Sequence, residues 1–493
     1  MGIFLGIDLG ASALKACLIE ANEGASGRAD LCPIAQTRAA YATAHPKPGH
    51  SEQNPADWLA AMHSALATLR HEHSQAFNAI EAISFSGGAH IGVLCDDEAM
   101  PLRPAIMWND QRAHEEAAAL KKATQAEGTV EELAGNAPNA TWTLPQLIWL
   151  GKHEPHVIKA TEKLYFAKDW LSAQLTGASG KDRHVTDATE AVGSLMAGRD
   201  GKWHDALIAL SGLSPSAIPR LVTMGSVLGE VSPAASVAFG LPLVPVYQGA
   251  IDTSMEWLCA APLDARTASL KLASAGVVSF TTTDETRFAP VSFYPHIIDG
   301  LSYHAAGMSD CMGAIEFVRQ NFTPKLTAHA FEAAAAKAAL GAEGLLFYPY
   351  LSGARAPFWD ATLTAELRGL TRGHDRKAIA RAAYEGVGHV LTAIWRDMTD
   401  RLGQKPDALH ILGGGGKSDF FCQMLADMLA VPIKRGRETD CAYATAVFAA
   451  AHHLGKQPQE MALAAYQPQG EFTPDKTNSA VYASLHQAFR KTL

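Results

Sequence analysis

At 493 residues, with 48% hydrophobic and 18% charged residues, the chain is too long for one hydrophobic core and is expected to form two large domains. The net charge of −9 gives no general attraction to nucleic acid or to an anionic membrane, so partners of these two classes are not expected. Seven scattered cysteines without a C-x-x-C pair argue against a disulfide framework and a zinc site. No apolar run reaches membrane-spanning length, and the first residues carry Asp8 rather than a basic leader, so we expect a cytoplasmic protein.

The chain opens with two short apolar segments, 3–7 and 13–19, which we expect to form paired strands. The turn between them, Gly10-Ala11-Ser12, leaves backbone N–H groups without strand partners, and such groups can bind phosphate oxygens. Asp8 ends the first segment and would face the Mg²⁺ that accompanies a nucleotide phosphate. An ordinary edge hairpin of an α/β domain has the same pattern, so this segment alone leaves both interpretations open.

Apolar, β-rich segments then alternate with long helical segments, which is the pattern of an α/β protein. Residues 269–281 repeat the strand, small-residue turn and strand of the N-terminus in the second half of the chain. We place the boundary in the Pro-containing segment 242–248 and expect domains at 1–247 and 248–493. Strands are expected at 79–85, 243–247, 270–272, 277–281 and 409–412, and helices at 111–126, 324–339 and 376–402.

Two polar residues lie where predicted strands end. Asp252 follows the strand 243–247 and precedes a helix, and α/β folds hold catalytic groups at such strand ends. It can equally be the N-cap of that helix, and the two roles are compatible. His90 lies in the glycine turn of the strand–turn–strand segment 84–94, where it can hydrogen-bond a polyol hydroxyl in either direction or serve only the fold.

A polar cluster at 108–112 ends an apolar stretch immediately before the predicted helix 111–126. In a sugar site, Asp110 would accept a hydroxyl, Arg112 would orient Asp110, and Trp108 would cover the carbon face of the sugar. The alternative is that Asn109 or Asp110 caps the helix.

A glycine-rich loop, 413–416, lies between the strand 409–412 and a predicted helix at 420–429. Its glycines let the backbone pass close to a flat ligand. The loop is not a P-loop, because that motif requires a glycine where this chain has Ile411.

Taken in this order, these segments resemble the FGGY family of carbohydrate kinases, and most of all its xylulokinase branch. The resemblance implies two actin-like (ribonuclease H-like) ATPase domains with an interdomain cleft. It implies ATP-dependent phosphorylation of a small ketose or polyol, first of all D-xylulose to D-xylulose 5-phosphate, with Mg²⁺, in a possible homodimer. The most specific matches are Gly6-Ile-Asp-Leu-Gly-Ala-Ser12, the Ser86-Gly-x-x-His90 turn, Trp108-Asn-Asp-x-Arg112, Lys168-Asp-Trp-Leu171, Thr186-Asp-Ala188 and the segment 344–357.

The resemblance also implies roles for single residues. Asp252 corresponds to the general base that takes the proton from the sugar hydroxyl, Asp8 to a carboxylate near Mg²⁺, and both to metal ligands. The implied sugar-binding residues are Ala89, His90, Trp108, Asp110, Arg112, Asp252 and Thr253. The implied nucleotide-binding residues are Gly10, Ala11, Ser12, Lys15, Ser274, Ala275, Gly276, Gly414, Gly415 and Ser418.

The chain departs from the pattern of the xylulokinases at three places. It has Gly88-Ala89 where they usually have Gln-Met, Ala273-Ser-Ala-Gly276 in place of Gly-Thr-Ser-Gly, and Ala354 in place of a glutamate. These changes leave open a kinase of another pentulose or polyol and a family member that has lost activity. A third alternative is a non-sugar, actin-like nucleotide-switch ATPase.

Overall fold

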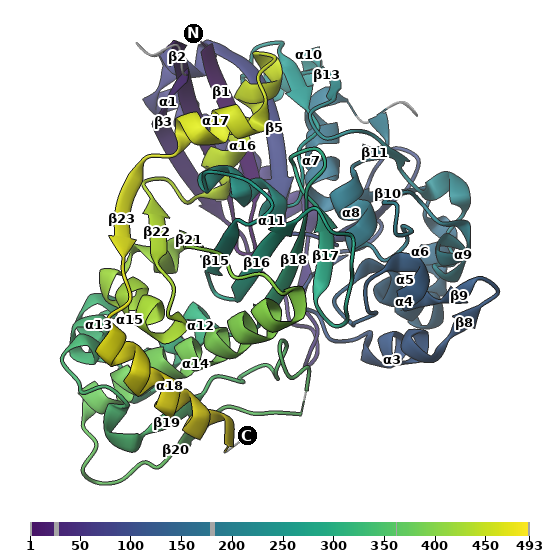
Figure 1. The fold of residues 1–493 in the computed structure, drawn as a ribbon. Helices are drawn as coiled ribbons and strands as arrows, with labels where there is room; N and C mark the ends of the chain where they lie inside the picture. Colours follow the sequence, from purple (N-terminus) through teal and green to yellow (C-terminus); the bar gives the residue numbers. More distant parts are fainter. Residues whose placement is uncertain (1, 24–28, 178–182, 361, 492–493) are drawn as a thin grey trace. The chain divides into compact units, whose positions relative to one another are not determined.

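The computed structural model describes residues 2–23, 29–177, 183–360 and 362–491 (Figure 1). The chain forms two compact units, which we describe in turn. Unit 1 comprises Met1–Pro262, Asp284–Ser302 and Asp440–Ala465, and unit 2 comprises Leu263–Thr283, Tyr303–Thr439 and Tyr466–Leu493. The units divide the chain differently from the proposed domains 1–247 and 248–493, because residues 248–262 and two later segments pack with the N-terminal part.

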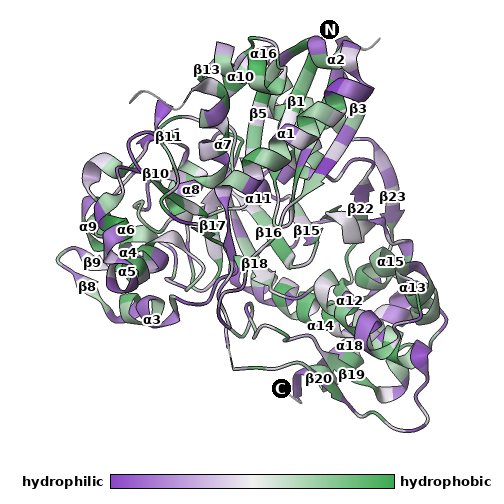
Figure 2. Cartoon of the chain, turned by 180° about the vertical axis from the view of Figure 1, so that it is seen from behind, coloured by the Kyte–Doolittle hydropathy of each residue, from purple (hydrophilic) through white to green (hydrophobic). Residues whose placement is uncertain are grey.

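Unit 1 is built on a six-stranded sheet with the order β13-β14-β5-β1-β2-β3. The strand β1 pairs antiparallel with β2 and parallel with β5, so the predicted N-terminal hairpin is confirmed. Helix α1 packs on β2 and β3 and α16 on β1 and β5, on opposite faces of the sheet (Figures 1 and 2). Burial on both faces explains why β1 and β5 are apolar along most of their length. The bounds are β1 Gly2–Leu9, β2 Ala13–Glu23, β3 Ala29–Ala40, β5 Ile80–Gly87, β13 Val227–Glu230, β14 Pro245–Tyr247, α1 Pro55–Glu72 and α16 Cys441–His453.

The remaining elements of unit 1 are short. The predicted helix 111–126 is wrong at both ends: α3 spans His114–Lys122, and residues 124–125 pair with 128–129 as the strands β8 and β9. The other elements are β4 Glu52–Gln53, α2 Ser74–Asn78, β6 Gly92–Cys95, β7 Ala105–Ile106, α4 Val130–Ala134, α5 Thr143–His153, α6 Pro155–Ala160, β10 Lys163–Phe166, α7 Ala167–Thr176, β11 Val185–Thr186, α8 Ala188–Gly193, α9 Asp205–Leu210, β12 Arg220–Leu221, α10 Pro233–Phe239, α11 Asp252–Met255, β17 Ser292–Pro295 and α17 Pro458–Ala465.

Unit 2 contains the strand order β18-β16-β15-β21-β22-β23. Here β15 pairs antiparallel with β16 and parallel with β21, so both units place an antiparallel hairpin beside a parallel strand. The predicted second hairpin is therefore confirmed. The bounds are β15 Ala268–Leu272, β16 Gly276–Thr282, β18 Ser302–Met308, β19 Leu346–Tyr348, β20 Glu366–Arg368, β21 Leu409–Leu412, β22 Ile433–Gly436 and β23 Pro468–Phe472.

Helices of unit 2 follow their sequence signals closely where a cap is present. Helix α14, Arg376–Leu402, matches the prediction at both ends, because Asp375 accepts two backbone N–H groups at its start and Gly403 ends it at φ +59°. Helix α13, Ala328–Ala336, is shorter than the predicted 324–339, since Thr327 caps it. The others are α12 Met312–Phe322, α15 Asp419–Leu429 and α18 Lys476–Lys491. Within the described ranges, we find no helix that is both long and apolar enough to cross a membrane.

Candidate functional site

Asp8, at the end of β1, is affected by two other carboxylates of unit 1, those of Asp252 and Asp440. Asp8 is 4% exposed and accepts a hydrogen bond from Ser86 Oγ of β5 at 2.9 Å. Lys15 lies opposite Asp8 in the β1–β2 register, and its Nζ pairs with Asp440 Oδ2 at 2.5 Å. Burial, followed by the negative charges of Asp252 and Asp440, raises the pKa of Asp8 to about 6. The neighbouring ammonium and hydroxyl only partly offset this rise.

Asp252 is the first residue of α11, and the N-cap is Ile251, which makes no side-chain cap. The predicted N-cap role of Asp252 is therefore wrong. Its Oδ1 accepts the backbone N–H of Thr253 at 2.7 Å. The loop that leads to it lies very close to β5, since a Cβ at Gly249 would be 1.8 Å from the carbonyl oxygen of Phe85. This close contact requires glycine and fixes where α11 begins.

Asp440 is a residue of this cluster that the sequence interpretation missed. It caps α16 by accepting the N–H of Ala442 at 3.0 Å, while its other oxygen binds Lys15. Its only local signal is that of a helix N-cap. Nothing in the sequence connects it to a lysine 425 residues away.

The cluster fits a Mg²⁺ ion shared with phosphate groups. Among the residues that the structure describes, no three His, Cys, Asp or Glu side chains form a group that could hold a metal ion by themselves. Mg²⁺ in kinases is usually bound by one or two carboxylates together with phosphates and water. Asp8 and Asp252, the predicted metal ligands, are the kind of incomplete oxygen donor set that such an ion needs.

The phosphate turn of unit 1 differs from its prediction in one respect. The Gly10 N–H donates to the carbonyl oxygen of Ala13 at 3.1 Å and is therefore already paired within the turn. Ala11 and Ser12 are exposed, and Ser12 Oγ accepts a bond from Arg38 at 3.4 Å. The exposed part of the turn thus comprises residues 11 and 12 alone.

The predicted sugar residues Gly88 to His90 and Trp108 lie close together in unit 1. His90 follows β5 with a left-handed backbone (φ +62°). A Cβ at Gly88 would lie 3.6 Å from Cδ1 of the half-buried Trp108 ring, and Ala89 beside it is partly exposed. The turn after β5 therefore presents small residues, a histidine and one aromatic ring.

Asp110 and Arg112 form a buried pair rather than a helix cap. Arg112 Nε and Nη2 donate to the two oxygens of Asp110 at 2.9 and 2.8 Å, and its Nη1 reaches Glu52 at 2.7 Å. Asp110, which is 0% exposed, also accepts the N–H of Ser51. The predicted cap is wrong, since α3 begins later, after Ala113.

A second charged cluster of unit 1 is fully buried. Lys168, 1% exposed, pairs with Asp169 and Asp187 at 2.6 Å each, and Gln248 Nε2 bridges the two carboxylates at 2.9 and 3.1 Å. Burial opposes the charge of Lys168, but the two carboxylates outweigh it and raise the pKa of the ammonium. The cluster ends four residues before Asp252 in the sequence, and we infer that it supports that loop.

In unit 2 the structure brings the second turn and the glycine loop together. The N–H groups of Cys311 and Gly313, around the start of α12, donate to the carbonyl oxygen of Ser274 at 2.7 and 3.2 Å. A Cβ at Gly415 would meet Leu272, just before that turn, at 2.8 Å. Ala275 and Gly276 complete the turn; Gly414 is exposed, and Ser418 caps α15 by accepting the N–H of Phe421.

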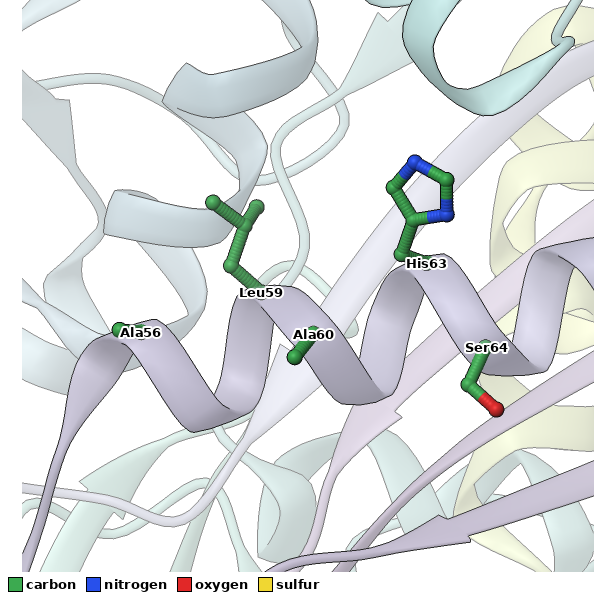
Figure 3. A pocket seen from close by; sticks show the side chains of 5 residues that line it. All are labelled: Ala56, Leu59, Ala60, His63 and Ser64. Carbon is green, nitrogen blue, oxygen red and sulfur yellow. The ribbon is translucent and has the colours of Figure 1, made fainter.

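A shallow hollow on α1 lies apart from this set. It is lined by Ala56, Leu59, Ala60, His63 and Ser64, all from one helix (Figure 3). None of the predicted site residues lines it, and it contains no carboxylate. It therefore plays no part in the site.

Comparisons with known proteins agree with these features. The models of the FGGY family of carbohydrate kinases match residues 3–259 with the N-terminal domain and 274–454 with the C-terminal domain. The xylulose kinase of Escherichia coli (strain K12) is 31% identical over 431 residues, 86% of this chain and 84% of that protein. The xylulose kinase of Staphylococcus xylosus is 27% identical over 504 residues and 99% of both chains.

Solved structures give the same fold. A xylulose kinase from Brucella ovis superposes with a TM-score of 0.87 at 26% identity, covering 99% of this chain and 98% of that one. The Plasmodium falciparum glycerol kinase with ADP has a TM-score of 0.84 at 18% identity, which shows the fold alone, over 100% and 98% of the two chains. The predicted α/β class with two actin-like domains is confirmed. The chain belongs to the FGGY family of carbohydrate kinases.

Proposed function

We propose that this kinase uses ATP to phosphorylate D-xylulose to D-xylulose 5-phosphate. The observation that carries the proposal is the cluster of Asp8, Asp252 and Asp440 in a chain whose relatives include xylulose kinases at 27% and 31% identity. Phosphoryl transfer needs mainly positioning and neutralisation of charge, and this cluster supplies a base and metal-binding oxygens.

Asp252 is the proposed general base. A carboxylate at the start of α11 can accept the proton of the sugar hydroxyl as that oxygen attacks the terminal phosphate of ATP. Asp8 and Asp252 would hold Mg²⁺, which neutralises phosphate charge when bound. Below its pKa of about 6, Asp8 carries a proton and is a poor metal ligand, so we expect it to act ionised.

The nucleotide is proposed to bind to backbone groups and small residues. The turns 10–12 and 274–276 and the loop residues Gly414, Gly415 and Ser418 are the candidates, together with Lys15. Lys15 forms an ion pair with Asp440, so its ammonium is already held in place near Asp8.

The sugar is proposed to contact His90, Ala89, Trp108 and Thr253 directly. Asp110 has no exposed surface, and both of its oxygens already accept hydrogen bonds. Together with Arg112 it holds the segment after Trp108 in place, and a direct contact of this pair with the sugar stays a prediction.

A kinase of another pentulose or of a polyol is the second candidate. Gly88 and Ala89 offer no long side chain to a substrate beside Trp108, so the contacts that select the sugar differ from those expected of a xylulokinase. The cytoplasmic location and the homodimer stay predictions.

The experiment is a measurement of ADP formation from ATP and Mg²⁺ across ketoses, pentitols, gluconate and glycerol. We expect D-xylulose to stimulate the wild type most strongly. Asp252→Asn should keep sugar binding and lower kcat by at least about 100-fold, which is the rate enhancement that general-base catalysis usually contributes. Asp57→Asn is the matched control, because Asp57 is an exposed aspartate that also lies in the first turn of a helix.

The outcomes separate the candidates. Strong stimulation by a different sugar would replace D-xylulose with that substrate. Near-wild-type turnover by Asp252→Asn would refute the role of Asp252 as the base. ATP hydrolysis that no sugar stimulates would contradict the kinase proposal and favour a nucleotide switch.

A further inference from the structure

We propose that Tyr294 is a positioning residue of the sugar site, whose hydroxyl fixes the tautomer and orientation of the His90 ring. The inference rests on the proposed function, in which His90 hydrogen-bonds a sugar hydroxyl. It adds a residue that comes from a distant part of the chain and that the sequence patterns did not single out.

The backbone of His90 is held from two sides. Its N–H donates to Glu190 Oε2 at 3.0 Å, and its carbonyl oxygen accepts a bond from Thr143 Oγ1 at 2.9 Å. The backbone is left-handed, with φ +62°, a conformation that residues other than glycine rarely adopt and that costs free energy. Such a conformation persists only where the surroundings hold it, and here two hydrogen bonds do so.

The imidazole ring is held as well. It stacks on Trp142 with centroids 4.9 Å apart and planes 14° from parallel. Gly193 leaves room for it, since a Cβ there would lie 2.7 Å from His90 Cδ2. The Nε2 atom of the His90 ring lies 2.6 Å from the hydroxyl oxygen of Tyr294.

Tyr294 reaches this position on an anchored strand. It lies in β17, within the segment 284–302 that joins unit 1 although it follows β16 in the sequence. The side chain of Asn136 receives the N–H of Phe293 at 2.8 Å and donates to its carbonyl oxygen at 3.0 Å. Arg287 covers the Phe293 ring at 4.4 Å and donates to the carbonyl oxygen of residue 134 at 2.9 Å. Tyr294 itself is buried, so its hydroxyl is a fixed group rather than a mobile surface one.

The chemical consequence concerns the direction of a hydrogen bond. A neutral imidazole has one N–H donor and one acceptor nitrogen, and the partner of one nitrogen decides which form is present. A phenol O–H donates more strongly than it accepts, so the favoured arrangement has Tyr294 donating to Nε2 and the imidazole proton on the buried Nδ1. A ring held in one tautomer and one orientation gives the site one fixed hydrogen-bonding arrangement, whereas a ring that exchanges between forms does not.

Tyr294→Phe tests this role, because it removes the hydroxyl and keeps the aromatic ring in the stack. We expect the KM for the sugar and its Kd to rise about fivefold, the effect of losing one hydrogen bond, with kcat within about twofold and an unchanged KM for ATP. A merely structural role would instead lower the melting temperature and affect both substrates alike.

A second readout does not depend on activity. Long-range ¹H–¹⁵N spectra of histidine-labelled full-length protein report the tautomer of each ring, and the spectrum of His90→Gln identifies the His90 signals. We expect a single tautomer in the wild type and a mixture, or the opposite tautomer, in Tyr294→Phe. Tyr247→Phe is the matched control, since Tyr247 also contacts a histidine in unit 1, His453 at 3.4 Å, and has no predicted role in the site.

The proposal requires both results. An unchanged His90 tautomer in Tyr294→Phe, or an unchanged sugar affinity, would overturn it. Failure of the proposed function has a different signature: His90→Gln would then bind the sugar as the wild type does, while the tautomer effect of Tyr294→Phe would persist.

Discussion

Replacing Asp8 with asparagine is expected to stabilise the protein while reducing its activity. Asp8 has a pKa of about 6 against 3.8 for a free side chain, because burial and two neighbouring carboxylates disfavour its charge. A carboxyl whose folded pKa is raised contributes stability below pH 3.8, and this contribution is lost as the pH rises to about 6. The gap corresponds to about 3 kcal/mol at neutral pH. Asparagine has no charge, and its oxygen can still accept the Ser86 hydroxyl.

The assay is thermal unfolding of wild type and Asp8→Asn without Mg²⁺ at several pH values. We expect Asp8→Asn to melt about 3 to 5 °C higher at pH 7.5, and the difference to disappear near pH 4. Added Mg²⁺ should stabilise the wild type more than Asp8→Asn, because the ion lowers the repulsion that the substitution has already removed. Asp57→Asn, at an exposed position, should show none of these effects.

Two outcomes would refute the reasoning on Asp8. The first is an Asp8→Asn protein that is less stable than the wild type at pH 7.5. The second is a stability difference that stays constant between pH 4 and pH 7.5, since the argument requires that it follow the titration of one carboxyl.

Two further substitutions test the supports of the site. Lys168→Met leaves Asp169 and Asp187 buried without their cation. It should lower the free energy of unfolding, measured by urea titration, by about 3 to 5 kcal/mol. An unchanged stability would contradict a structural role for this cluster. Gly249→Ala places a Cβ 1.8 Å from a carbonyl oxygen of β5, so it should displace Asp252. We expect kcat to fall at least about tenfold while the circular dichroism spectrum is retained. A wild-type kcat would show that the loop tolerates the added methyl group.

The sequence predicts local structure best where a local signal has no competitor. The hairpin of β1 and β2 and the long helix α14 have periodic apolar residues, and Asp375 and Gly403 mark the ends of α14. The signal fails where a polar residue has a stronger distant partner. Asp110 looks like a helix cap, but Arg112 offers it two charge-assisted bonds, and the helix begins later.

Parts of the site that are assembled over long sequence separations could not be predicted in this way. Asp440 joins Lys15 across 425 positions, and Tyr294 joins His90 across 204. Each has an ordinary local appearance, as a helix cap in one case and as a residue of a short strand in the other. Only the return of the segments 284–302 and 440–465 to unit 1 places them beside residues whose chemistry was visible in the sequence.

The two charge clusters of unit 1 differ in where the cation is bound. The Lys168 ammonium pairs with the carboxylates of Asp169 and Asp187, and Gln248 Nε2 donates a hydrogen bond to each of them. One cation thus faces two carboxylates, and the neighbouring Glu190, whose pKa burial raises well above the usual range, adds a third acidic group.

At Asp8 the nearby cation is paired with a different carboxylate. Lys15 binds Asp440, and burial and the negative charges of Asp252 and Asp440 outweigh the effect of Lys15 on Asp8, whose pKa is raised to about 6. A fold optimised for stability alone would place a cation directly against Asp8, as it places Lys168 against Asp169 and Asp187. The destabilisation that we expect at Asp8 is therefore the physical counterpart of its proposed function, because the negative charge that opposes folding is the charge that the proposed Mg²⁺ would neutralise.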